Sequence, residues 1–326
     1  MLLLSGNVPG KSHFQIGTLK NGFRWRELFM FELIQLTAHD YYIDCPAKIG
    51  LVVSDGGDAF LIDSGSDKDA AKKVLRILQD KGWALRKIFN THSHADHIGG
   101  NRFLQEKTGC SIYAADIESV FACNPILEPT GLYGGLPFKN IRNKFLMAPE
   151  SSVLPLSEDV LPQGMQIIRL PGHCFSMSGF LTPDGTAFIA DCVSSPETLE
   201  KYGIGYLWDP EASLDTLEQI KNLEAKCFVP SHAEVTENVV PLAEMNIQAI
   251  RAVKAKILEL CRNPMTFEVL LKRIFDEYGL QMSAQQYVLI GSTLRSYLSS
   301  MFDRGEISFE FSENQMLWKT VPEDNQ

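Results

Sequence analysis

The stretch Thr91-His92-Ser93-His94-Ala95-Asp96-His97-Ile98-Gly99-Gly100-Asn101 is the most informative part of this chain. It places three imidazole groups and one carboxylate within six consecutive positions, from His92 to His97. These are the side chains that bind transition-metal ions such as zinc in proteins. A histidine-rich surface loop is the simpler alternative, but it accounts only for Asp96, as a helix cap. The stretch therefore predicts a metal site.

The residues before this stretch indicate that two of its histidines act together. Residues 85–90 read Leu-Arg-Lys-Ile-Phe-Asn, which predicts a short strand that ends at Thr91. In an extended chain, residues two positions apart point to the same side. His92 and His94 can therefore bind one ion together.

After the strand the pattern changes to that of a helix. Asp96 can cap its start, and the helix is predicted to run to Lys107. Asp96 and His97 lie where the chain bends, so they are expected to point away from the first pair, toward a second ion. Gly99 and Gly100 have no side chains, and this lets the first helical turn approach whatever is bound there.

Length, composition and charge are those of a soluble globular protein. The chain of 326 residues suits one large and one small domain. Its net charge of -10 argues against nucleic-acid binding by bulk electrostatics, because phosphate neutralisation requires a basic surface. No run reaches the ~18 apolar residues that are needed to cross a bilayer, so no contact with membranes is expected.

The cysteines and the start of the chain indicate the compartment. Seven cysteines are an odd number and form no Cys-x-x-Cys pair, which favours free thiols and a reducing compartment. The opening Met-Leu-Leu-Leu is too short for a signal peptide. We therefore expect a cytoplasmic protein. Residues 1–29 lack clear periodicity and are predicted to be an N-terminal extension, and Met30 is an alternative start of translation.

Strands and helices are expected on both sides of the histidine-rich stretch. Strands are predicted at residues 31–36, 41–45, 48–54 and 59–63, with a tight turn at 55–58. An amphipathic helix is predicted at 66–81 and ends at Gly82. Residues 124–158 have no regular pattern, and a loop this long is usually functional or disordered. Its aromatic residues, including Tyr133 and Phe138, suggest a lid over a pocket, with a packed surface loop as the alternative.

Three later segments share one pattern, an apolar run followed by a side chain that can bind metal. Residues 166–170 lead to His173, residues 186–190 to Asp191, and residues 227–230 to His232. Strands that end at the same edge of a sheet bring their last residues to one place. His173, Asp191 and His232 can therefore converge with the cluster at 92–97.

The complete pattern resembles the active site of the metallo-β-lactamase superfamily. It consists of His-x-His-x-Asp-His at 92–97, then His173, Asp191 and a strand-end His232. The resemblance covers roughly residues 30 to 240. It implies an α+β fold, a four-layer αββα sandwich with metals at one edge of two packed sheets. Residues 30–241 would form this catalytic domain.

The resemblance also implies a role for each residue of the pattern. A first ion would be held by His92, His94 and His173, and a second by Asp96, His97 and His232, with Asp191 bridging the two. Two such ions can share a hydroxide that acts as the nucleophile, and Asp96 could relay a proton to the leaving group. Zinc suits these ligands, and iron or manganese could occupy them too. Asp63 resembles a family position that braces the ligand loop, although a simple turn residue is the alternative.

The bridging carboxylate narrows the expected chemistry. An Asp at position 191 resembles the thioesterase, lactonase and phosphodiesterase branches, whereas members that hydrolyse β-lactams usually lack it. The prediction is a dinuclear hydrolase that cleaves a small ester, thioester or lactone. A persulfide dioxygenase with a single iron is the alternative within the same fold. Tyr206 and Trp208, in the segment 202–209, are further candidates for the wall of the substrate pocket, or for the core.

Residues 242–326 change in character and suggest a winged helix. Helices are predicted at 242–262, 266–278 and 284–304, followed by hairpin strands at 307–311 and 315–320. A winged helix raises the alternative of a nucleic-acid-binding protein or nuclease. However, residues 244–326 carry nine Lys and Arg against eleven Asp and Glu. Packing, a homodimer, or closure of the pocket over a small-molecule substrate fits this charge better.

Overall fold

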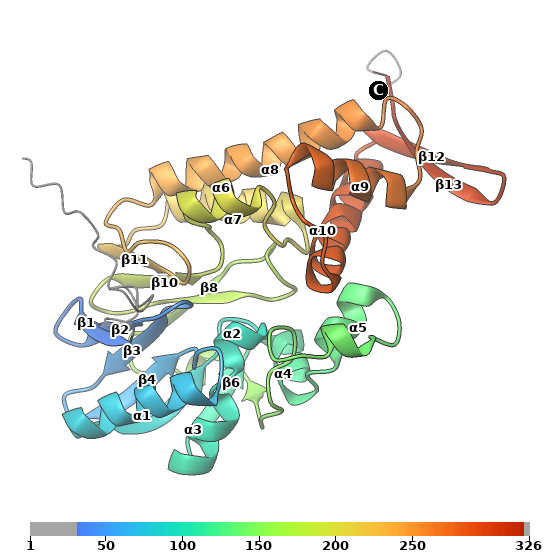
Figure 1. Ribbon diagram of the computed structural model, residues 1–326. Coiled ribbons are helices and arrows are strands. Elements are labelled where there is room, and N and C mark those ends of the chain that lie inside the picture. Colours follow the sequence, from blue (N-terminus) through green and yellow to red (C-terminus); the bar gives the residue numbers. More distant parts are fainter. Residues whose placement is uncertain (1–30, 323–326) are drawn as a thin grey trace, which may run out of the picture.

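Two β-sheets face each other at the centre of the molecule, and helices cover their outer faces (Figure 1). The computed structural model describes residues 31–322. One sheet has seven strands in the order β1-β2-β3-β4-β5-β6-β7, and the other has four in the order β11-β10-β9-β8. The expected α+β class and the αββα sandwich are therefore confirmed. The N-terminal extension predicted at 1–29 lies outside the described residues.

The strands agree with the sequence prediction at most positions. The seven-stranded sheet contains β1 (Glu32–Gln35), β2 (Asp40–Asp44), β3 (Ile49–Val53), β4 (Asp58–Ile62), β5 (Ala84–Phe89), β6 (Ser111–Ala114) and β7 (Leu154–Pro155). The four-stranded sheet contains β8 (Gln166–Arg169), β9 (Ser178–Leu181), β10 (Thr186–Ala190) and β11 (Cys227–Pro230). β9 was not predicted, because a four-residue strand that contains a glycine carries a weak signal.

Aromatic side chains fill the space between the two sheets. Phe89 of β5 and Phe180 of β9 are fully buried, and their ring centroids lie 5.7 Å apart. Such a pair contributes about 0.5–1.5 kcal/mol beyond the area that it buries. Gly50 of β3 is required here, because a Cβ at this position would lie 2.6 Å from the ring of Phe188. These contacts fix the position of one sheet relative to the other.

Helices on the two outer faces complete the four layers. The seven-stranded sheet is covered by α1 (Lys68–Lys81) and α3 (Asn101–Thr108), and the four-stranded sheet by α7 (Pro210–Lys221) and α8 (Val240–Leu260). The helix predicted at 66–81 is confirmed as α1. The side chain of Asp67 caps its start by accepting from two backbone N–H groups, and Gly82 ends it with φ 71°.

The segment 124–158 is more regular than the sequence predicted. It contains α5 (Leu127–Tyr133), β7 and two single-turn helices, η2 (Lys139–Ile141) and η3 (Glu158–Val160). The apolar side of α5 packs on α10 (Ala284–Asp303), where Leu132 and Val288 belong to one small apolar cluster. The partner of α5 is therefore distant in sequence, which is why its short apolar pattern was not recognised. Two other short helices, α4 (Asp116–Cys123) and α6 (Pro196–Tyr202), also escaped prediction.

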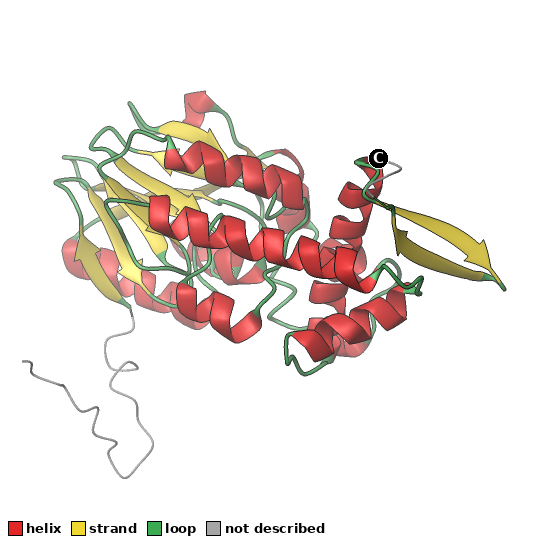
Figure 2. Ribbon diagram, turned by 90° about the horizontal axis from the view of Figure 1, so that it is seen from above, coloured by secondary structure: helices red, strands yellow, loops and turns green. Residues whose placement is uncertain are grey.

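The C-terminal part has the predicted order of elements. α8 is followed by α9 (Phe267–Glu277), α10 and the hairpin β12 (Ile307–Ser312) and β13 (Gln315–Thr320), which projects from the body (Figure 2). α8 lies along α7, and a single apolar core cluster contains residues from both sides of position 241. The domain boundary at 241 and the winged helix stay predictions. In the part of the chain that the structure describes, no helix is long and apolar enough to span a membrane.

Candidate metal centre

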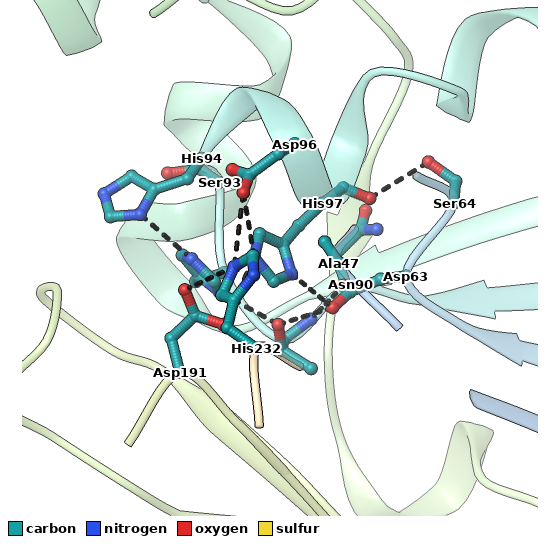
Figure 3. A network of polar contacts seen from close by, with 12 residues as sticks. Ala47, Asp63, Ser64, Asn90, Ser93, His94, Asp96, His97, Asp191 and His232 are labelled. Atoms are coloured by element: carbon teal, nitrogen blue, oxygen red, sulfur yellow. Dashed lines mark hydrogen bonds and ion pairs between the residues drawn. The ribbon is translucent and has the colours of Figure 1, made fainter. Parts of the chain in front are cut away.

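The seven side chains predicted to bind metal lie together at one edge of the two sheets, and His94, Asp96, His97, Asp191 and His232 are labelled in Figure 3. Each belongs to a segment where a strand ends. His92 and His94 follow β5, Asp96 and His97 lie on α2 (Ala95–Ile98), and His173, Asp191 and His232 follow β8, β10 and β11. Residues that lie up to 140 positions apart in the sequence, from His92 to His232, are therefore close together at this edge. They fall into groups that could each hold an ion.

Three imidazole nitrogens form the first group. His94 Nδ1 lies 2.9 Å from His92 Nε2 and 3.0 Å from His173 Nε2. Three nitrogens at this spacing can surround one ion, because zinc–nitrogen bonds are ~2.0–2.1 Å long. The first group thus has the composition and spacing of a three-histidine metal site.

The second group lies beside the first and shares Asp191 with it. His232 Nε2 is 3.3 Å from Asp96 Oδ2 and 3.2 Å from Asp191 Oδ2. His97 Nε2 lies 3.3 Å from Asp191 Oδ1, and His173 Nε2 lies 3.6 Å from Asp191 Oδ2. The carboxylate of Asp191 therefore lies between the histidines of both groups.

Hydrogen bonds on the outer side of the rings determine which nitrogen is free to bind. The Nδ1 atoms of three rings face oxygen acceptors: Asp63 Oδ2 at 2.8 Å from His97, the Tyr206 carbonyl at 3.2 Å from His173, and the Pro46 carbonyl at 2.9 Å from His232. A carbonyl or carboxylate can only accept, so Nδ1 must carry the proton. In a neutral ring, Nε2 then presents its lone pair to the centre.

The other two histidines follow the same logic. The Thr91 hydroxyl donates to Asp63 Oδ2 at 2.8 Å, so it accepts from His92 Nδ1 at 2.9 Å and leaves Nε2 of His92 unprotonated. His94 Nε2 lies 3.5 Å from Glu128 Oε1, and its Nδ1 is therefore the nitrogen that faces the centre. Each of the five rings therefore directs its second nitrogen inward, and in a neutral ring this nitrogen carries a lone pair.

Two buried atoms at the centre lack a hydrogen-bond partner among the described residues. They are His97 Nε2 and Asp191 Oδ1, which lie 3.3 Å apart outside hydrogen-bond geometry. Buried polar groups normally have hydrogen-bond partners, so a ring nitrogen and a carboxylate oxygen that both lack one require an explanation. A divalent cation satisfies both, and the residues present fit such an ion.

Burial and charge set the protonation of the rings. Burial lowers the pKa of His173 to about 3, so this ring is neutral at pH 7, the form that binds metal. Burial also opposes the charge of His232 and of His97, but nearby carboxylates, Asp191 foremost, outweigh it. They raise the pKa of His232 to about 10 and the pKa of His97 well above its usual value. The second group is therefore a site of negative potential that favours a cation.

The helix predicted from Asp96 to Lys107 is divided into two helices, α2 and α3, and the prediction that Asp96 caps it is wrong. α2 starts at Ala95 without a side-chain cap, and the chain turns at Gly99 and Gly100 before α3 begins. A Cβ on Gly99 would lie 2.1 Å from the Ser66 carbonyl oxygen, and the backbone of residue 64 is similarly close to Gly100. The two glycines thus serve close packing against residues 64–66, and this interrupts the helix. Asp96 instead faces His232.

Two carboxylates hold the stretch in place. Asp63, predicted as a bracing residue, accepts from Thr91 N at 2.8 Å in addition to the Thr91 hydroxyl and His97, and it adopts φ 67° to do so. Glu118 on α4 was not predicted. It accepts from Ser93 N at 3.0 Å, Ser93 Oγ at 2.7 Å and Ser176 N at 2.9 Å. The only sequence signal for Glu118 was a charge within an apolar helical segment.

The four residues predicted for the pocket are placed differently from one another. Tyr206 lines the cavity at the centre, and its ring centroid lies 5.3 Å from that of His94. Tyr133 and Phe138 are exposed and pack on each other at 5.3 Å, and Trp208 packs on Phe175. These three do not line that cavity. The sequence reasoning also missed Glu128, which does line it, because α5 was not predicted.

Comparisons with known proteins agree with this geometry. The sequence profile of the metallo-β-lactamase superfamily matches residues 42–232. Hydroxyacylglutathione hydrolase of Pelagibacter ubique is 50% identical over 176 residues, which are 52% of this chain and 61% of the relative. The protein of the same name from Dechloromonas aromatica is 30% identical over 210 residues, 63% of this chain and 66% of the relative. The chain thus spans less than two thirds of the length of these relatives.

Solved structures show the same fold over most of the chain. A metallo-β-lactamase family protein of Thermus thermophilus superposes with a TM-score of 0.67 at 16% identity, over 89% of this chain and 97% of that one. A β-lactamase domain protein from Burkholderia ambifaria has the same score and identity over 90% and 96%. At this identity the likeness concerns the fold alone. It extends beyond residue 232 and so includes much of the C-terminal part.

Proposed function

Because this chain belongs to the metallo-β-lactamase superfamily, we propose that it is a metal-dependent hydrolase of a small thioester, ester or lactone. The observation that carries the proposal is the orientation of the five histidine rings, which each turn one nitrogen toward Asp191 and its surroundings. The relatives named hydroxyacylglutathione hydrolase support an acyl thioester as the substrate. A small molecule is therefore the expected partner.

The proposed ligands follow from the two groups. His92, His94 and His173 would hold one divalent ion, and Asp96, His97 and His232 a second, with Asp191 shared between them. Zinc is the first choice for this combination of imidazole and carboxylate. When bound, such ions polarise a carbonyl oxygen and provide a nucleophile at neutral pH.

Residues of the chain itself would position the substrate and move protons. The Asp96 carboxylate is partly exposed and faces the cavity, where its Oδ2 lies 3.3 Å from His232 Nε2. An ionised Asp96 can accept a proton from the nucleophile and pass it to the leaving group. Phe145 and Leu146 line the same cavity and would limit the access of water to the reacting bond.

Metal analysis combined with a substrate panel tests this function. We expect about two equivalents of zinc in the reconstituted protein and hydrolysis of thioesters or lactones, with β-lactams inert. Asp191→Ala should lose metal content and turnover together, whereas Asp215→Ala, an exposed aspartate on α7, should change neither. Wild-type turnover in Asp191→Ala, or full activity after removal of metal by a chelator, would contradict the proposal.

A further inference from the structure

Two neighbouring cavities meet beside the candidate metal centre. The first, of ≈ 230 Å³, contains His94, Asp96 and Asp191 in its wall, and we call it the ion-facing cavity. The second, of ≈ 240 Å³, lies between α6 and α10, and we call it the inner cavity. Tyr206 and Leu289 line both, so the two spaces adjoin. The inner cavity therefore lies directly beside the cavity that faces the metal ligands.

The inner cavity has an uncharged lining. Among the described residues, its wall consists of apolar side chains, hydroxyl groups, one amide and a glycine, with no Asp, Glu, Lys or Arg. Leu199 and Ile204 come from the catalytic part, and Ile290 from the C-terminal part. By contrast, the ion-facing cavity contains three carboxylates, those of Asp96, Asp191 and Glu128. An ionised group in the inner cavity would be desolvated without a charged partner, which is unfavourable.

One face of α10 supplies the wall of the inner cavity on the C-terminal side. Gln286, Leu289, Ile290 and Thr293 all line it, and their spacing of three and four residues places them on one side of the helix. The Thr293 hydroxyl accepts from Leu207 N at 3.1 Å and so fixes the loop that carries Tyr206 against α10. The C-terminal part therefore forms part of the wall of a cavity that adjoins the ion-facing cavity.

We propose that the substrate carries an uncharged, apolar acyl chain that lies in the inner cavity. This inference rests on the proposed hydrolase function. The scissile carbonyl lies in the ion-facing cavity, beside the histidines. The leaving group departs through the ion-facing cavity, whose rim includes Phe145 with 69% of its surface exposed. In this arrangement the face of α10 determines acyl specificity. Each methylene of the acyl chain that becomes buried should raise kcat/KM about fourfold, which corresponds to ~0.8 kcal/mol.

Thioesters that differ only in the acyl group test this inference. Acetyl, octanoyl and succinyl thioesters of N-acetylcysteamine would be compared with the zinc-loaded full chain. We expect kcat/KM for octanoyl to exceed that for acetyl by more than tenfold, and succinyl to be the poorest substrate. Leu289→Lys and Gln286→Lys should each abolish the octanoyl preference and improve succinyl. Ser299→Lys, on an exposed side of α10, should keep the wild-type order.

The outcomes separate this inference from the proposed function. Equal rates for acetyl and octanoyl, or an octanoyl preference that survives both lysine variants, would overturn the inference while the hydrolase function stands. If no thioester, ester or lactone is cleaved, the proposed function fails, and calorimetric binding of octanamide and acetamide still decides the inference. Octanamide should then bind at least tenfold more tightly than acetamide to the wild type but not to Leu289→Lys. Equal binding would overturn it.

Discussion

Both ends of the sandwich place a histidine between two carboxylates, but only one end buries them. At the metal end His97 has no exposed side-chain surface, and Asp63 and Asp191 are 3% and 11% exposed. At the opposite end His39 lies 3.1 Å from both Asp55 and Asp184, whose side chains are 99% and 31% exposed. Strand β10 joins the two ends, since Asp184 precedes it and Asp191 follows it. The two ends therefore share histidine and carboxylate side chains, and they differ in how deeply these side chains are buried.

The difference follows from the cost of removing charge from water. Exposed ion pairs are hydrated and screened by salt, so they contribute little to stability. Buried polar groups must be satisfied by partners, and every partner removed leaves an unpaired group behind. Matched substitutions at the two ends should therefore have very different effects, and this gives four tests of the comparison.

The largest effect is expected from adding one methyl group to the backbone at the metal end. Gly99→Ala should lower the free energy of unfolding by about 4 kcal/mol or more, because the new Cβ would lie 2.1 Å from the Ser66 carbonyl oxygen. Gly56→Ala, in the turn at the opposite end, has no atom closer than 3.9 Å and should change it by roughly 0.5 kcal/mol at most. Chemical denaturation measures both. Equal losses would remove the contrast between the ends.

A slightly smaller effect is expected when one carboxylate is neutralised at each end. Asp63→Asn weakens the hydrogen bonds that Asp63 accepts from Thr91 and His97. It should therefore lower the free energy of unfolding by about 3 kcal/mol and reduce metal affinity roughly 10- to 100-fold. Asp55→Asn removes one exposed partner of His39 and should leave metal affinity unchanged. Denaturation and competition with a chromophoric chelator measure the two quantities. Unchanged metal affinity in Asp63→Asn would show that its hydrogen bonds do not orient the ligand loop.

Metal addition gives a third test of intermediate size. Zinc at about one hundred times its dissociation constant should raise the free energy of unfolding by ~2.7 kcal/mol. His39→Gln should keep this increase, because the pair at the opposite end lies outside the candidate ligand groups. His232→Gln should lose most of it. Thermal unfolding with and without zinc measures this increase in stability. If His39→Gln lost the increase and His232→Gln kept it, the metal would bind at the opposite end of the sandwich, and the candidate metal centre would be wrong.

The smallest effect concerns pH at the opposite end. Two hydrogen bonds raise the pKa of His39 above 6.5, and the bond to Asp55 contributes more than the bond to Asp184. Because the folded pKa is the higher one, the contribution of His39 to stability is fully present below pH 6.5 and is lost as pH rises through the folded pKa. Solvent screening keeps this contribution small. Difference melting curves of wild type and His39→Gln should therefore converge toward alkaline pH, and a growing difference would contradict the assignment.

The sequence was informative where the signal is local. Short-range patterns of apolar and turn residues predicted the strands up to β5, helix α1 with its end at Gly82, and the C-terminal helices and hairpin. The single helix predicted after Asp96 failed because the contact that requires Gly99 comes from the backbone of residue 66. α5 was missed for the same reason, since the surface that it buries is supplied by α10.

By itself, the sequence determined the set of candidate metal-binding side chains, because imidazole and carboxylate groups at strand ends form a recognisable pattern within short segments. Only the tertiary structure decided which nitrogen faces inward in four of the five rings, since the oxygen atoms of Pro46, Asp63, Glu128 and Tyr206 lie far from these histidines in sequence. It also decided that α10 borders the inner cavity. The physical reason is that side-chain orientation and burial depend on packing between distant segments, which local patterns do not encode.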